Sequence, residues 1–216
     1  MGSKRTLPRL IQTVRPKSGD SPMKHPLLTT LLAATLLVAG LNARATEVAG
    51  VRFDDRQHLE QQELVLNGAG LRSKFFIKVY AMGLYLPEKK TDAAGVLNSK
   101  GPKRITIVPL MELSAQQFVE ALSGGIEKNL SDTEIAPLKD RLQTFDNTLL
   151  ALGKASKGTP IALDWVPGKG TRLVVGGQAK GNPIPGEDFY RALLRIWLGD
   201  KPTQGDLKDN LLGKAS

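Results

Sequence analysis

The chain has 216 residues, with 30 Lys and Arg against 21 Asp and Glu, and it has no Cys. Residues 1–45 hold seven of the basic residues and one acidic residue, which leaves 23 basic and 20 acidic residues, a net charge of about +3, in residues 46–216. This near balance argues against a nucleic-acid partner, and the lack of Cys excludes disulfides and thiol chemistry. No metal or nucleotide motif is present, so we expect no cofactor.

Residues 1–45 are expected to be a leader that takes no part in the fold. The signal peptide itself begins near Met23, continues through an uncharged, mostly apolar stretch at 27–41, and ends in the small-x-small sequence Ala43-Arg44-Ala45. An uncleaved membrane anchor is the alternative, but an apolar run of 15 residues is short against the roughly 20 that span a bilayer. We therefore expect cleavage after Ala45, export to the periplasm, no integral membrane span after cleavage, and a single domain over residues 46–216.

The first half of this domain has the composition of strands. Residues 51–53 and 63–66 are predicted as short strands, and His58, in the polar segment between them, is expected to be a solvated loop residue. Residues 74–86 are predicted as one strand that ends at Pro87, because proline cannot donate to a ladder. One face of this strand is apolar throughout and is expected to cover a core; it carries Phe75, Ile77, Val79, Ala81 and Tyr85.

Helices follow a further strand at 103–108. Ser114 and Gln117 have the spacing of a capping box, which predicts a helix starting at Ser114. The pair Gly124-Gly125 lies inside this helix, so either the backbone packs closely there or the helix is interrupted. A second capping pattern at 131–134 predicts another helix that reaches about residue 152.

The last part of the domain is predicted as a hairpin followed by a helix. Residues 160–165 and 171–175 are the two strands of the hairpin, and residues 189–197 have apolar side chains at helical spacing. A short final helical turn is expected near Leu207. Strands and helices are segregated along the chain instead of alternating, which favours an α+β fold with an antiparallel sheet.

Three stretches of the chain resemble the chalcone isomerase-like family, in its bacterial exported branch. They are residues 66–86, residues 125–130 (Gly-Ile-Glu-Lys-Asn-Leu) and residues 188–202 (Asp-Phe-Tyr-Arg-Ala-Leu-Leu-Arg-Ile-Trp-Leu-Gly-Asp-Lys-Pro). The resemblance implies an open-faced sandwich, in which a large antiparallel sheet is covered on one face by a layer of helices and a ligand cleft lies between them. In the plant enzymes of the family an arginine assists an intramolecular ring closure. In the fatty-acid-binding branch an arginine and a tyrosine hold a carboxylate.

The resemblance assigns ligand-binding roles to particular residues of this chain. Arg72 matches the arginine that follows the glycine pair, and Tyr80 falls where the fatty-acid binders have tyrosine and the enzymes have threonine. The tyrosine–asparagine pair of the enzymes is missing from the helix that starts at Ser114, which argues against the plant reaction. On one straight strand residues 72 and 80 would be about 26 Å apart, so the chain must fold back between them. Lys78 is the alternative cation.

The sequence thus leads to three hypotheses. The first is a periplasmic, non-catalytic protein that binds a fatty acid or similar amphipathic carboxylate. The second is an intramolecular lyase or isomerase acting on a flavonoid-like or other phenolic substrate. The third is a structural or interaction protein with a closed cleft. The first two imply a small amphipathic or aromatic ligand as partner.

Overall fold

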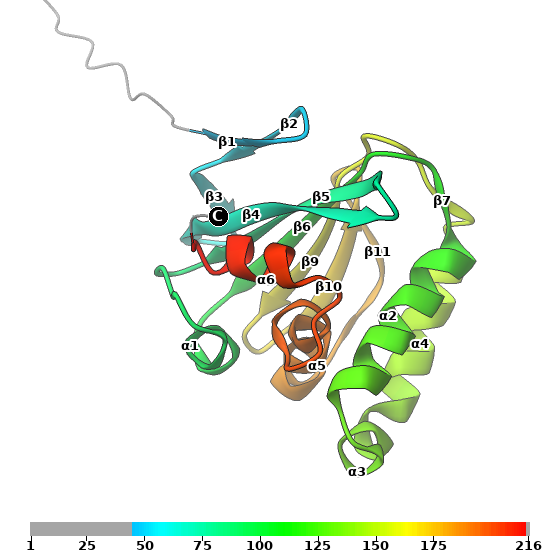
Figure 1. The fold of residues 1–216 in the computed structure, drawn as a ribbon. Helices are drawn as coiled ribbons and strands as arrows, with labels where there is room; N and C mark the ends of the chain where they lie inside the picture. The colour runs from blue at the N-terminus through cyan, green and yellow to red at the C-terminus, as the bar shows by residue number, and fades with distance from the viewer. Residues whose placement is uncertain (1–44, 215–216) are drawn as a thin grey trace, which may run out of the picture. The chain divides into compact units, whose positions relative to one another are not determined.

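The computed structural model describes residues 45–214, so most of the expected leader lies outside the described residues. A seven-stranded antiparallel sheet dominates the fold, in the order β11-β10-β9-β6-β5-β4-β3 (Figure 1). Its strands are β3 (Arg56–Leu59), β4 (Gln62–Lys74), β5 (Ile77–Leu86), β6 (Lys103–Pro109), β9 (Ile161–Val166), β10 (Gly170–Val175) and β11 (Gln178–Ile184). Two small sheets accompany it: β1 (Ala45–Val48) with β2 (Val51–Asp54), and β7 (Leu113–Ser114) with β8 (Lys154–Ala155).

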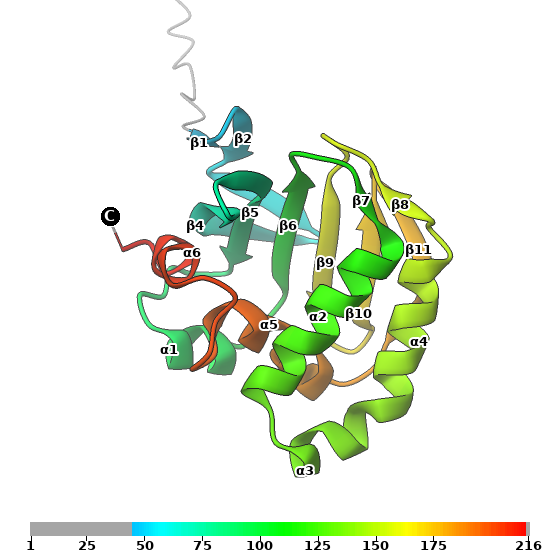
Figure 2. The same cartoon turned by 45° about the vertical axis from the view of Figure 1, so that its right-hand side comes forward.

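The helices cover one face of the large sheet (Figure 2). They are α1 (Ala93–Asn98), α2 (Ala115–Asn129), α3 (Asp132–Ile135), α4 (Lys139–Leu150), α5 (Glu187–Leu198) and α6 (Gly205–Leu211), with a 3₁₀ turn, η1 (Ala136–Leu138), between α3 and α4. This arrangement confirms the expected α+β open-faced sandwich. None of the helices in residues 45–214 has the length and apolar character needed to cross a membrane.

The alternation of side chains along β5 separates two apolar clusters. Tyr80, Met82 and Leu84 join the main core beneath the helices. Ala81 and Tyr85 point to the opposite face and pack in a smaller cluster that includes Phe53 of β2. Because successive side chains in a strand point to opposite faces, Tyr80 is fixed on the side of the sheet where the helices lie.

Residues 74–86 do not form the single strand predicted from the sequence. Strand β4 ends at Lys74 and β5 begins at Ile77. Phe75 and Phe76 form the tight turn between them, with φ of 48° and 67°. Two-residue hairpin turns with positive φ normally use Asn and Gly, so the sequence carried no turn pattern here. The predicted core face is also wrong at this end, because Phe75 and Ile77 are exposed.

The predicted capping box at Ser114 is confirmed: Gln117 N–H donates to the Ser114 hydroxyl, and Gln117 Oε1 accepts from Ser114 N–H. Helix α2 runs without interruption through the two glycines. A Cβ on Gly125 would lie 2.6 Å from Ile196 Cγ2, whereas one on Gly124 would meet nothing within 4 Å. Gly125 therefore permits the close approach of α2 and α5. Of the two alternatives for Gly124-Gly125, close packing of the backbone is right and an interrupted helix is wrong.

Other expectations need smaller corrections. The capping pattern at Ser131 opens only α3, and Pro137 lies in η1, so the long helix begins afterwards at Lys139 and ends at Leu150. The hairpin predicted at 160–175 is confirmed as β9 and β10, and the last long helix as α5.

His58 is exposed, but it belongs to the edge strand β3 and not to a loop. Strand β11 was not predicted because it is a largely exposed edge strand without apolar alternation.

Candidate functional site

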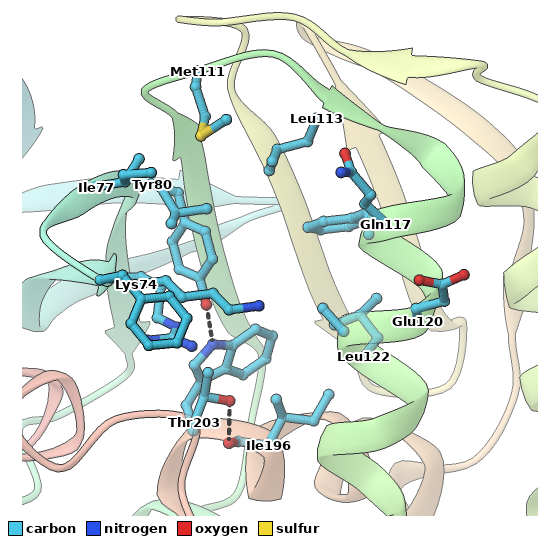
Figure 3. Close-up of a pocket in the computed structure, with 16 residues that line it drawn as sticks. Lys74, Ile77, Tyr80, Met111, Leu113, Gln117, Glu120, Leu122, Ile196 and Thr203 are labelled. Carbon is cyan, nitrogen blue, oxygen red and sulfur yellow. Dashed lines mark hydrogen bonds between the residues drawn. The ribbon is translucent and has the colours of Figure 1, made fainter.

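A cavity of about 710 Å³ lies between the β4–β5 hairpin and helix α2, with side chains of α5 also lining it (Figure 3). Its size falls within the range of small-molecule sites. Most of its lining side chains are apolar, with a few charged and polar groups among them. The lining residues are Arg72, Lys74, Phe75, Ile77, Val79, Tyr80, Met111, Leu113, Gln117, Phe118, Glu120, Ala121, Leu122, Ile196, Trp197 and Thr203.

Arg72 and Tyr80 meet on one wall of this cavity. The turn at Phe75-Phe76 folds the chain back, and Arg72 of β4 is the register partner of Tyr80 of β5. Directly opposed residues of an antiparallel pair project to the same face, and both side chains line the cavity. The extended-strand separation of about 26 Å therefore does not apply. Lys78 is exposed and is absent from the lining residues, whereas Lys74 lines the cavity.

The hydroxyl of Tyr80 is held in place by helix α5. Trp197 Nε1–H donates to Tyr80 Oη at 2.9 Å in a buried hydrogen bond (Figure 3). Because an indole can only donate, the tyrosine oxygen accepts and its own hydrogen remains to be donated. Burial raises the pKa of Tyr80 above its usual range, although the Trp197 hydrogen bond and the positive charge of Arg72 oppose the shift. Tyr80 is therefore a neutral hydrogen-bond donor at physiological pH.

The guanidinium of Arg72 is half-buried and is positioned by Gln204. Arg72 Nη1 donates to Gln204 Oε1 at 3.2 Å and to the backbone carbonyl of Ser73. The same Gln204 oxygen accepts from Ser73 N–H at 2.9 Å, and Gln204 Nε2 donates to Leu71 O at 3.3 Å. In residues 45–214 no salt bridge involves Arg72. The site therefore contains a guanidinium whose charge no carboxylate of the described chain neutralises.

The glycine pair before Arg72 brings Gln204 to it. A Cβ on Gly68 would lie 2.0 Å from the backbone carbonyl oxygen of Asn210, and one on Gly70 would lie 2.9 Å from Asn210 Cβ. A side chain at Gly68 would clash with the backbone of α6 and one at Gly70 would force a neighbour to shift, so the two glycines let α6 lie against β4. Gln204 is the N-cap residue of α6. Docking of α6 on the two glycines thus places the amide that orients Arg72.

Two residues that hold the site together are not predictable from sequence patterns. Trp197 lies on the apolar face predicted for the last long helix, and nothing in the sequence indicates that its indole N–H has a partner on β5. Gln204 follows a proline-containing segment and belongs to no motif. A buried Trp commonly has a partner for its N–H, which was the one available hint, but only the fold identifies Tyr80 as that partner.

The wall opposite the hairpin comes from α2. It contributes Gln117 and Glu120 together with apolar side chains such as Phe118 and Leu122. Gln117 Oε1 is engaged in the capping box, and Glu120 Oε1 accepts from Gln116 Nε2 at 3.0 Å. Among the described residues no cluster of His, Asp or Glu could hold a metal ion. The cavity lining therefore combines the cationic groups and phenol of the hairpin, the amide and carboxylate of α2, and apolar side chains.

The chain resembles known proteins in sequence and in fold. The chain matches the model of the chalcone isomerase-like family over residues 45–213. Its fold is similar to that of a fatty-acid binding protein from Arabidopsis thaliana, with a TM-score of 0.58 and 17% identity over 78% of this chain and 96% of that one. The comparison with curated protein sequences finds no match. The family model covers most of the chain, and the chain belongs to the chalcone isomerase-like family.

Proposed function

We propose that this protein is a periplasmic, non-catalytic carrier that binds a fatty acid or a similar amphipathic carboxylate in the cavity beside Arg72. One observation carries the proposal: a half-buried guanidinium without a carboxylate partner in residues 45–214 lies directly across the hairpin from the hydroxyl of Tyr80, on the wall of an apolar cavity. A buried charge is costly unless it is paired. A ligand carboxylate would supply the missing partner.

The chemistry of the two groups suits a carboxylate. The planar guanidinium can donate two parallel hydrogen bonds to the two carboxylate oxygens. The hydrogen of the Tyr80 hydroxyl is available because its oxygen accepts from Trp197. A hydrocarbon tail would lie along side chains such as Leu113, Phe118 and Leu122, and each buried CH₂ would contribute about 0.8 kcal/mol.

Three further observations support the proposal. The Arabidopsis protein of similar fold is described as a fatty-acid binding protein. Residues 1–45 have the basic start, apolar stretch and small-x-small end of a secretory leader, which supports export. The polar groups that α2 contributes are Gln117 and Glu120, where the resemblance to the plant enzymes would call for tyrosine and asparagine. This difference favours binding over the intramolecular lyase reaction.

Mass spectrometry of lipids extracted from the purified, exported protein tests the proposal. We expect fatty acids to co-purify with the wild type and to be depleted from Arg72→Met, which keeps much of the aliphatic side chain and removes the charge. A Lys157→Met variant, altered at an exposed lysine outside the cavity and the β4–β5 hairpin, is expected to retain them. Turnover of a chalcone that is abolished by Arg72→Met would instead support the lyase hypothesis. Equal amounts of lipid in the two variants would show that Arg72 does not bind the ligand carboxylate.

A further inference from the structure

The tip of the β4–β5 hairpin, Lys74–Lys78, exposes an unusual set of side chains. Phe75, Phe76 and Ile77 are 84%, 104% and 56% exposed, and Met111, which lines the same cavity, is 39% exposed. These are four of the five large apolar side chains that are exposed in residues 45–214; the fifth is Leu150 in α4. Contiguous exposed apolar groups of this kind mark interaction sites.

The two phenylalanines of the turn have backbone conformations that are unfavourable for bulky residues. Both have positive φ, a conformation in which Asn and Gly are favoured and bulky side chains are strained. Phe76 is fully exposed, so its ring gains no burial that would offset the strain. Breaches of local rules that bring no benefit to the fold are expected at functional positions.

The charges beside the apolar tip indicate what it contacts. Lys74 and Lys78 flank the three apolar residues, both are exposed, and neither takes part in a salt bridge within the described chain. Aromatic side chains next to lysines suit the boundary between the headgroups and acyl chains of a bilayer, where the rings insert and the lysines meet anionic headgroups. The tip consists of five residues, whereas each partner in a standard protein interface contributes roughly 20–30 residues.

We propose that the hairpin tip Lys74–Lys78 docks the protein on an anionic lipid bilayer. Phe75 and Ile77 of the tip, and the exposed Met111 that follows β6, also line the cavity, and in Figure 3 Ile77 and Met111 both lie above the Tyr80 hydroxyl. A docked tip therefore turns this part of the cavity lining toward the membrane. This proposal concerns the surface of the protein and does not depend on the identity of the cavity ligand.

Co-sedimentation with vesicles tests the docking proposal. We expect the wild-type chain to bind vesicles of phosphatidylcholine with phosphatidylglycerol and to bind pure phosphatidylcholine vesicles much less. Phe76→Asn keeps a residue that tolerates positive φ and lies outside the cavity lining, and it is expected to lower the partition coefficient about tenfold. Lys78→Glu is expected to lower it at least about fivefold on the anionic vesicles.

Matched variants elsewhere on the surface serve as controls. Leu150→Ser removes the exposed apolar side chain of α4, and Lys139→Glu reverses an exposed charge at the start of the same helix; both are expected to bind vesicles like the wild type. Equal binding by Phe76→Asn and Leu150→Ser would overturn the proposal. A dimer in sedimentation equilibrium that is lost in Phe76→Asn, without vesicle binding by the wild type, would also overturn it and assign the tip to a second copy of the chain.

A second readout separates docking from ligand binding. Titration with fatty acid in detergent-free buffer is expected to give the same affinity for Phe76→Asn and the wild type, whereas transfer of fatty acid from anionic vesicles is expected to slow in the variant. Loss of affinity in solution would place Phe76 in the ligand site and contradict the docking role. If Arg72→Met binds fatty acid as tightly as the wild type, the proposed carboxylate ligand of Arg72 is wrong. The docking proposal, which rests on vesicle binding, is not changed by that result.

Discussion

Arg72 and Tyr80 occupy directly opposed positions on β4 and β5, and both side chains line the same cavity. Each is held by a different helical element. Arg72 donates a hydrogen bond to Gln204, at the start of α6, and Tyr80 accepts one from Trp197 of α5. A donor pair oriented from two sides in this way is positioned before any ligand arrives, which lowers the entropic cost of binding.

Removing the Tyr80 hydroxyl is expected to lower the stability of the fold. Tyr80→Phe leaves the buried Trp197 N–H without its acceptor, which should lower the free energy of unfolding by about 1–3 kcal/mol. Chemical denaturation of Tyr80→Phe, Trp197→Phe and the double variant measures this loss. We expect the double variant to lose less than the sum of the single variants, because the two changes remove one shared hydrogen bond. Strict additivity would contradict that bond.

The adjacent glycines of α2 provide a matched pair of substitutions. Gly125→Ala would place a Cβ 2.6 Å from Ile196 Cγ2, so we expect it to destabilise the protein by about 1–3 kcal/mol through overpacking. Gly124→Ala meets open space and should stabilise the helix by up to about 1 kcal/mol. Thermal unfolding of both variants should shift in opposite directions, and shifts of the same sign would contradict the packing of α2 on α5.

The three tyrosines of the chain are expected to make the fold sensitive to alkali. Burial is the largest cause that raises the pKa of Tyr80, Tyr85 and Tyr190 above the usual range. The unfolded chain therefore releases these protons at a lower pH than the native chain does, and stability should fall as the pH rises beyond about 10. Ultraviolet absorbance should show tyrosinate appearing together with the loss of circular dichroism. Tyrosinate at about pH 10 in a still-folded chain would contradict this.

Relief of strain at the hairpin tip should be measurable as stability. Phe76 has a φ of 67° and is fully exposed, so Phe76→Gly removes the steric penalty of positive φ, which is about 1–2 kcal/mol. The higher entropy of glycine in the unfolded chain offsets part of this gain, and a net increase of about 0.5–1 kcal/mol is expected. Phe76→Val is the control, since a β-branched residue is worse in this conformation. A glycine variant less stable than the wild type would show that the ring supports the fold.

The sequence patterns were sufficient to predict an α+β fold, the capped helix α2 and the hairpin of β9 and β10, because apolar spacing and capping residues are local properties. The open-faced sandwich was implied by the family resemblance. It also placed Arg72 and Tyr80 in one site through the family resemblance. The turn at Phe75-Phe76 could not be predicted, since its residues break the preference on which turn prediction rests. Gln204 and Trp197 act across more than a hundred residues of sequence, and only the packing of α6 and α5 brings them to the hairpin.

The central claim is that Arg72 pairs with a ligand carboxylate. The most direct measurement is a calorimetric titration of a long-chain fatty acid and of the alcohol of the same length into the wild type, Arg72→Met and the control Lys157→Met. A charge-assisted hydrogen bond contributes about 1.5–3 kcal/mol, so the wild type and the control should favour the acid by about 10-fold to 100-fold. Arg72→Met should bind acid and alcohol alike. An undiminished preference for the acid in Arg72→Met would contradict the pairing.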